Sequence, residues 1–477
     1  MTTPSRILLI ALLAAALGCA SSTPEPPRPS AAPTAPDHTQ AVDALASQLV
    51  EGDWTVGLSI AIVTPDREEH HHYGRRSTTS AARPDDETLY EIGSVTKTFT
   101  GLLLAREVVA GRVALNTPVQ RCLPEGVTLQ GEAPITLLHL ATHTSGLPRM
   151  PTNFAPAEPA DPFADYGPER LHAYLNARPP VKPPGSPYAY SNLGAGLLGY
   201  ALTRCGDAPS YEALLRAQLL EPLGMTRTTL ALPASGANAA TGHDTEGRPV
   251  MSWTLNVLEG AGGIRSSTAE MARFLRAMMA PPEPLAEAVA LATTPQARRP
   301  QGRIGLGWHI GVGDAPPLER VVWHNGQTGG FHSFVGYDPK ARVGVVVLSN
   351  TAQPVIDKLG HALLLTASGE PAALTLPIPA TVSPDTLARY AGAYTIAPGA
   401  VMTITTEDGK LYAQLTGQPR LRVWPVNQTT FAYRAVDAQL VFFPAKDGAV
   451  PRMELHQGGR IIPGARQPND TPPQDAP

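Results

Sequence analysis

The sequence predicts an α+β fold, in which an antiparallel sheet with flanking helices and a helical insert is followed by a small C-terminal all-β domain. Strand-like alternation of apolar residues occurs at 56–63 and returns at 321–350, with helical patterns between them. Short alternating runs separated by turn residues fill 384–466. A chain of 477 residues is also longer than a domain with a single hydrophobic core normally is. We therefore expect two domains, with a cleft between the first sheet and its insert.

The N-terminal residues 1–19 have the layout of a secretory signal peptide, with Arg6, an apolar run too short to span a membrane, and small residues before Cys19. This ending resembles a bacterial lipoprotein signal, which predicts lipidation of Cys19. Ala16 stands where such signals usually carry leucine, so cleavage with release is the alternative. Residues 20–40 are rich in Pro, Ala, Ser and Thr and predict an extended tether. We expect a periplasm-facing lipoprotein of the bacterial cell envelope, or else a soluble periplasmic or secreted protein.

Net charge, cysteines and a run of histidines bear on possible nucleic-acid binding, disulfide formation and metal binding. The net charge is −4 and no dense Lys/Arg cluster occurs, which argues against nucleic acid. Cys122 and Cys205 can pair in an oxidising compartment, but the sequence leaves both the paired and the free state open. His70, His71 and His72 fall in a predicted hairpin strand at 67–73. Because successive strand residues point to opposite faces, we expect exposed histidines and no metal site.

Ser94 and Lys97 are one helical turn apart at a predicted helix start. Gly93 and Ser94 form a start signal, and apolar residues then recur at helical spacing. Residues three apart share a helix face, so the lysine lies within reach of the hydroxyl. A lysine in a partly dry pocket loses basicity and can accept a serine proton. Alone, the pattern also fits a capping serine beside a surface lysine.

The next stretch contains two histidines at zinc-like spacing. His139 and His143 are one turn apart within 135–147, but the glutamate that would activate a metal-bound water is missing between them. We interpret this stretch as a structural helix and turn. Residues 148–182 follow as a long irregular segment, which favours a wall or lid of the cleft.

Tyr190 and Asn192 are two residues apart on an irregular segment, so both can face one cavity. Their phenol and amide, together with a hydroxyl and an amine, can form a proton relay. Directly afterwards, 194–199 matches G-x-G-x-x-G, but no buried strand precedes it and no acidic residue follows a second strand. We therefore expect close helix packing there and no dinucleotide or other cofactor. The chain also lacks the nucleophile-elbow and P-loop motifs.

The later part of the chain divides in two. A helix is predicted at 267–279, and strands return at 304–310 and 321–350, which closes a first domain over 41–366. A linker at 367–383 leads to evenly spaced short strands over 384–466, typical of a small antiparallel barrel or sandwich. The tail 467–477 reads as disordered.

Six motifs occur in the order seen in class C β-lactamases and their penicillin-binding DD-peptidase and esterase relatives, the AmpC/AmpH-like family. They are Glu91–Lys97, Ile135–Pro148, Tyr190–Asn192, Pro222–Met225, Ile304–Trp308 and His324–Gly330. The resemblance covers about residues 41–366 and rests on their order rather than on any one motif. It implies a β-lactamase/transpeptidase-like fold and a serine hydrolase.

The resemblance also implies roles for single residues. Ser94 is the expected acylated nucleophile, Lys97 its proton partner and Tyr190 the general base and acid. The expected substrate-binding residues are Asn192, His324, Asn325 and Gly326. The backbone N–H groups of Ser94 and Gln327 are the expected oxyanion hole, and neither a metal nor a cofactor is needed.

His324 stands where class C β-lactamases carry lysine. An imidazole with an ordinary pKa of about 6.5 is only partly charged at neutral pH, so recognition of an acidic group should weaken as the pH rises. This favours a DD-peptidase of the carboxypeptidase/endopeptidase type acting on peptidoglycan-type D-alanyl peptides, with β-lactams as slow acylating inhibitors. The alternatives are a class C-like β-lactamase, a short-chain esterase of the same fold, and a penicillin-binding sensor that does not turn over.

Overall fold

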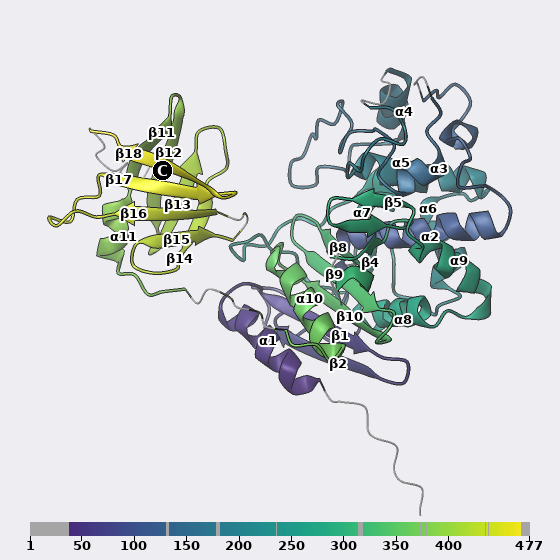
Figure 1. Cartoon of the computed structure of the whole chain (residues 1–477), viewed down its shortest axis with the longest axis horizontal. Coiled ribbons are helices and arrows are strands. Elements are labelled where there is room, and N and C mark those ends of the chain that lie inside the picture. Colours follow the sequence, from purple (N-terminus) through teal and green to yellow (C-terminus); the bar gives the residue numbers. More distant parts are fainter. Residues whose placement is uncertain are drawn as a thin grey trace, which may run out of the picture. The chain divides into compact units, whose positions relative to one another are not determined.

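The structure is a computed structural model, shown in Figure 1. It describes residues 38–129, 133–177, 182–234, 236–312, 318–372, 374, 376, 379–434, 436 and 438–468. The predicted signal peptide with Cys19, most of the predicted tether, and residues 469–477 of the predicted tail lie outside the described residues. Within the described part of the chain, no helix is long and apolar enough to cross a membrane.

One antiparallel sheet of eight strands organises the first domain (Figure 1). The spatial order of its strands is β2 (Glu68–Gly74), β1 (Gly57–Val63), β10 (Val343–Ser349), β9 (His332–Asp338), β8 (Val322–Gln327), β7 (His309–Ile310), β6 (Gly302–Ile304) and β5 (Ala297–Arg299). The register sets Ile60 opposite Val347, so strands from the two ends of the domain pair side by side. The predicted α+β class is confirmed.

The sheet is buried on both faces, because its central strands alternate between two apolar clusters. Ile60 and Val347 belong to the cluster covered by α1 (Thr39–Glu51) and α10 (Val355–Ala367). Their strand neighbours Ala61 and Val346 belong to the cluster that includes α2 (Thr96–Val109) and α8 (Thr268–Met279). Burial of both faces explains why these strands read as near-continuous apolar runs.

A helical insert between β2 and β5 carries most of the remaining short elements. They are β3 (Tyr90–Glu91), η1 (Gly93–Val95), η2 (Val119–Cys122), α3 (Leu137–Ala141), α4 (Pro168–Ala177), α5 (Asn192–Cys205), α6 (Tyr211–Leu215), η3 (Arg216–Leu220), η4 (Asn256–Leu258), α7 (Glu259–Gly262), β4 (Arg265–Ser266) and α9 (Glu283–Thr293). A further turn, η5 (Leu318–Arg320), precedes β8.

Helix α4 corrects the prediction that 148–182 is irregular throughout. Its buried residues Leu171, Tyr174 and Leu175 recur at helical spacing. The proline-rich residues on either side conceal this short pattern in the sequence.

The two cysteines left open by the sequence form a disulfide. Cys122 and Cys205 have Cα atoms 5.2 Å apart and are 83 residues apart in the chain. The bond ties η2 to the last residue of α5, the helix that begins with Asn192. A disulfide of this kind typically stabilises a domain by about 2–4 kcal/mol.

The three consecutive histidines of β2 are not the exposed, unaccompanied residues expected from sequence. Their side chains are only 10–17% exposed, and each lies near a carboxylate. The Nε2 atom of His72 is 2.6 Å from Asp86, and His71 lies on the other face, near Glu69. The two glutamates lie on the same strand, two residues before the histidines that they approach, so strand alternation places them together. Asp86 comes from a separate loop, and the sequence does not reveal its proximity.

The C-terminal domain is a closed barrel, which decides between the barrel and the sandwich. It consists of α11 (Pro384–Tyr390) and the strands β11 (Gly392–Ala397), β12 (Ala400–Glu407), β13 (Lys410–Leu415), β14 (Leu421–Pro425), β15 (Thr430–Tyr433), β16 (Ala438–Phe443), β17 (Arg452–Gln457) and β18 (Arg460–Arg466). Each strand pairs with the next, and β11 pairs with β18 to complete the ring. Tyr394, Phe431 and Phe442 fill its core.

Candidate active site

Ser94 lies in η1, directly before α2, where the backbone comes close to the end of β8. Gly93 has a φ of +49°, and a Cβ there would lie 2.7 Å from the backbone nitrogen of Gln327. A Cβ on Gly326 would lie 2.0 Å from the carbonyl oxygen of Ile92. Glycine at both positions permits this close approach of the two main chains. The backbone segments that carry the predicted oxyanion donors, Ser94 and Gln327, therefore lie next to each other.

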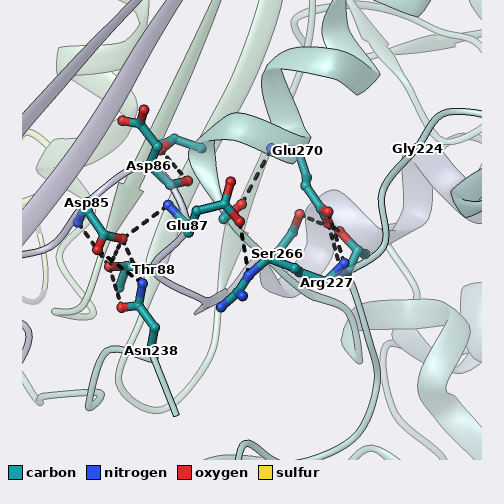
Figure 2. Close-up of polar contacts among 12 residues, drawn as sticks. Asp85, Asp86, Glu87, Thr88, Gly224, Arg227, Asn238, Ser266 and Glu270 are labelled. Carbon is teal, nitrogen blue, oxygen red and sulfur yellow. Dashed lines mark hydrogen bonds and ion pairs between the residues drawn. The ribbon is translucent and has the colours of Figure 1, made fainter.

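A polar network anchors the segment that leads to Ser94 (Figure 2). Asp85 accepts a 2.8 Å hydrogen bond from Asn238, and Glu87 forms a 3.0 Å ion pair with Arg227. Glu270 of α8, itself buried, accepts a hydrogen bond from the Arg227 backbone nitrogen at 2.9 Å. Residues 85–88 are thereby attached to α8 and to the segment around Arg227, which fixes the approach of the chain to the serine.

Lys97 is buried and has three hydrogen-bond partners. Its Nζ atom is 3.0 Å from Ser94 Oγ, 3.0 Å from Asn192 Oδ1 and 2.6 Å from the carbonyl oxygen of Ala261. Burial, and then the charge of Arg149, lower the Lys97 pKa well below its ordinary value. A neutral amine has two N–H donors and one lone pair. Because Asn192 Oδ1 and the Ala261 carbonyl can only accept, the lone pair is left for the Ser94 hydroxyl.

Tyr190 completes the group around the serine. The Lys97 Nζ atom lies 4.9 Å from the centroid of the Tyr190 ring. Burial raises the pKa of the phenol, and a hydrogen bond with Ser94 opposes this shift. The phenol is therefore protonated at neutral pH, beside an amine that tends to be neutral.

His143 holds the segment that carries Tyr190. Its Nδ1 atom accepts a 3.1 Å hydrogen bond from the Ser191 backbone nitrogen, and its carbonyl accepts one from Ala189 at 2.9 Å. Its ring centroid is 4.5 Å from that of Tyr190. The structural interpretation of this stretch is confirmed, but sequence did not reveal the contact with Tyr190. The other histidine, His139, forms the capping box of α3 with Thr136.

Asn192 is placed by the start of α5, where the Ser191 side chain accepts a 2.8 Å hydrogen bond from the Gly194 nitrogen. A Cβ on Gly196 would lie 2.6 Å from a side-chain carbon of Leu258, and one on Gly199 would lie 2.9 Å from Gly260 Cα. The prediction of close helix packing at this glycine motif is confirmed. This packing brings α7, with the Ala261 carbonyl, up to Lys97; no sequence signal marks that acceptor.

His324 of β8 departs from the expectation of an ordinary imidazole. The ring is buried, and burial together with the nearby Lys97 lowers its pKa to about 3. The expected partial charge at neutral pH is therefore wrong, because sequence does not reveal desolvation. Its Nδ1 atom donates to the Asn325 carbonyl at 2.5 Å, so Nε2 carries a lone pair. Nε2 has no hydrogen-bond partner in the described part of the chain.

His309 of β7 is a site residue that sequence missed. Its ring stacks on that of His324 with centroids 4.4 Å apart. Burial lowers its pKa well below the usual value, and neither ring nitrogen has a hydrogen-bond partner among the described residues. Its position directly after the glycine-rich motif ending at Trp308 is the signal that could have pointed to it.

Asn325 points to the other face of β8, because strand neighbours alternate. Its amide nitrogen donates to Asp357 Oδ2 at 2.8 Å, and the other oxygen of Asp357 lies 2.8 Å from His332 Nε2. Nothing in the sequence marks Asp357 as a neighbour of this motif. The adjacent Lys358 is exposed. The substrate-binding roles of Asn192, His324, Asn325 and Gly326 stay predictions.

The described residues contain no group of three or more His, Cys, Asp or Glu side chains arranged to hold a metal ion. The chemistry that the site offers is that of a serine hydroxyl beside an amine and a phenol.

Residues 42–368 match the protein-family model described as Beta-lactamase. The chain belongs to this family. Residues 376–466, which include the barrel, match a separate domain of unknown function, DUF3471.

Individual relatives agree with this assignment. The chain is 28% identical to a beta-lactamase of Pseudomonas fluorescens over 366 residues, which cover 69% of this chain and 99% of that protein. It is 27% identical to the D-alanyl-D-alanine-carboxypeptidase/endopeptidase AmpH of Escherichia coli, over 64% of this chain and 82% of that protein. The solved D-alanine carboxypeptidase AmpC of Burkholderia cenocepacia has a TM-score of 0.59 and 26% identity, over 69% of this chain and 98% of that one. The protein is a serine hydrolase of the class C β-lactamase and DD-carboxypeptidase family.

Proposed function

We propose that this enzyme is a DD-peptidase of the carboxypeptidase/endopeptidase type, which cleaves peptidoglycan-type D-alanyl peptides through a Ser94 acyl-enzyme. The observation that carries the proposal is the 3.0 Å contact between Lys97 Nζ and Ser94 Oγ, where burial favours the neutral amine. Serine is a weak nucleophile until a base takes its proton, and this contact supplies the base.

In the first half-reaction, Lys97 takes the Ser94 proton while Oγ bonds to the substrate carbonyl carbon. The N–H groups of Ser94 and Gln327 stabilise the negative oxygen, each by about 3 kcal/mol of barrier. Tyr190 gives its phenolic proton to the leaving nitrogen as the C–N bond breaks, and the proton on Lys97 restores the phenol. In the second half-reaction, water adds to the acyl ester and one of its protons returns to Ser94 Oγ.

The strand beside the serine favours this proposal over a dedicated β-lactamase. At neutral pH His324 offers a neutral acceptor and no fixed cation, while Asp357 places a carboxylate behind Asn325. A β-lactam carboxylate therefore gains little from these residues. A short-chain ester without an acidic group needs no cation to bind a carboxylate, so ester hydrolysis is the second candidate. A class C-like β-lactamase and a sensor that is acylated without turnover are the further alternatives.

The test is steady-state turnover of nitrocefin, a D-alanyl dipeptide substrate and a short-chain ester by the parent, Ser94→Ala and His324→Lys. We expect the parent to cleave peptide or ester faster than nitrocefin, Ser94→Ala to lose all three activities and covalent β-lactam labelling, and His324→Lys to gain nitrocefin turnover. Efficient parental nitrocefin hydrolysis without peptide or ester cleavage would make the β-lactamase the better assignment. Labelling of Ser94 without turnover of any substrate would favour the sensor.

We also propose that the mature protein is a lipoprotein of the periplasmic side of the envelope, anchored through Cys19. The support is the signal-like residues 1–19 and the proline-rich segment after them. Cys19→Ala should move the protein from the membrane fraction to the soluble fraction or block its processing. Parental protein found wholly in the soluble periplasm would exclude the anchor and favour release by simple cleavage.

A further inference from the structure

Arg149 is a cationic residue at the active site that the mechanism above does not use. Its Cζ atom lies 5.1 Å from the centroid of the Tyr190 ring. Its carbonyl oxygen accepts hydrogen bonds from the backbone nitrogens of Asn192 at 3.0 Å and Leu193 at 3.2 Å. The main chain of Arg149 is thus fixed to the segment that positions Tyr190 and Asn192.

Arg149 is exposed, and its guanidinium makes no hydrogen bond or ion pair within the described part of the chain. Arg170, by contrast, lies 2.7 Å from the Asp165 carboxylate and also bonds two backbone carbonyls. The Arg149 charge acts on both groups: after burial it further lowers the pKa of Lys97, and it opposes the burial that raises the pKa of Tyr190. A cation with five donors, over the Tyr190 ring and without a partner among the described residues, is available to a ligand.

We propose that Arg149 is a specificity-determining residue that binds an acidic group of the substrate beside Tyr190. A guanidinium can hold a carboxylate through two parallel hydrogen bonds. His324 cannot supply this cation, because it is neutral at the pH at which the enzyme would work. The preferred substrate class is an acyl donor with a free carboxylate close to the scissile carbonyl. This inference rests on the proposed function.

Arg299 of β5 is the rival cation. Its Cζ atom lies 5.4 Å from the centroid of the Trp323 ring, and its Nη1 atom is buried without a partner among the described residues. Its charge acts on His309 and His324 and not on Lys97. Arg299 therefore lies against β8, and its charge does not contribute to the lowered pKa of Lys97.

The test compares two p-nitrophenyl esters of succinic acid, one with a free distal carboxylate and one with a primary amide there. The measured quantity is the ratio of their kcat/KM values. This ratio cancels any common effect of Arg149 on the basicity of Lys97. We expect Arg149→Gln to lower the ratio about tenfold or more, mainly through a higher KM for the acidic ester, and Arg149→Lys to restore part of it, since lysine keeps the charge but not the two-pronged geometry.

Arg204→Gln is the matched control, because Arg204 lies in the last turn of α5, about 18 Å along the helix from Asn192. It should leave the ratio unchanged. An unchanged ratio in Arg149→Gln, or a fall seen only in Arg299→Gln, would overturn the inference.

If the parent hydrolyses neither ester, the proposed function fails for this class. Calorimetry then still tests Arg149, by measuring how succinamic acid and succinamide bind to Ser94→Ala and to the double variant Ser94→Ala/Arg149→Gln. A preference for the acid that depends on Arg149 supports the inference. Equal binding of the two ligands overturns the inference.

Discussion

The two sides of the site around Ser94 both bury nitrogen bases, but they differ in the partners that they provide. On the helix side, Lys97 has contacts with Ser94, Asn192 and the Ala261 carbonyl. On the strand side, three ring nitrogens of His309 and His324 have no partner among the described residues. Burial is the main cause of the lowered pKa on both sides. The contrast teaches that burial sets which form of a base is stable, whereas its partners decide whether it is aimed at a reacting atom.

The largest expected effect comes from removing the base on the helix side. Lys97→Met keeps an unbranched chain of similar length but removes the acceptor for the Ser94 proton. Turnover should fall by a factor of roughly 100 to 10,000, while substrate binding changes much less. Single-turnover acylation of the parent and the variant measures this. Lys358→Met removes an exposed lysine of α10 and is the control. Turnover within threefold of the parent in Lys97→Met would mean that the Ser94 proton has another acceptor.

The second-largest expected effect is on the pH dependence of kcat/KM, which distinguishes Lys97 on the helix side from His324 on the strand side. Lys97 must be neutral to act, so kcat/KM should fall on acidification through its lowered pKa, about tenfold per pH unit below it. His324, with a pKa of about 3, stays neutral over this range and should add no second step. The comparison is kcat/KM from pH 4 to 9 for the parent and His324→Asn. An ionisation near 6.5 that disappears in the variant would show that His324 does titrate there, contrary to its burial.

The smallest expected effect is on stability, at the strand side. His309→Phe keeps an aromatic ring against His324 and Trp323 but removes two buried nitrogens without partners. The free energy of unfolding should rise by about 1 kcal/mol, since an unsatisfied buried polar group costs about 1–3 kcal/mol. Urea denaturation of the parent and the variant measures the difference. His309→Asn, which keeps polar atoms, should not gain stability. A loss of stability in His309→Phe would mean that those nitrogens are satisfied in solution.

Several expectations at the site followed from local sequence alone. The positions of Ser94 and Lys97 at a helix start, and the close packing at the glycines of α5, depend on spacing within one or two turns. Helix α4 was not predicted from the sequence, because prolines surround its short apolar pattern. Among the acidic neighbours of the β2 histidines, Asp86 could not be inferred from local spacing, because it lies on a separate loop.

The sequence by itself determined the fold class, the order of the motifs and the choice of residues to which we assign the chemistry. These follow from helical and strand periodicity and from side-chain type, which are properties of short segments. The tertiary structure alone decided that Cys122 pairs with Cys205, that the Ala261 carbonyl reaches Lys97, that Asp357 holds Asn325 and that His324 is neutral. The physical reason is that pairing requires two distant segments to meet, and that the desolvation of a base depends on every group packed around it, whatever its distance along the chain.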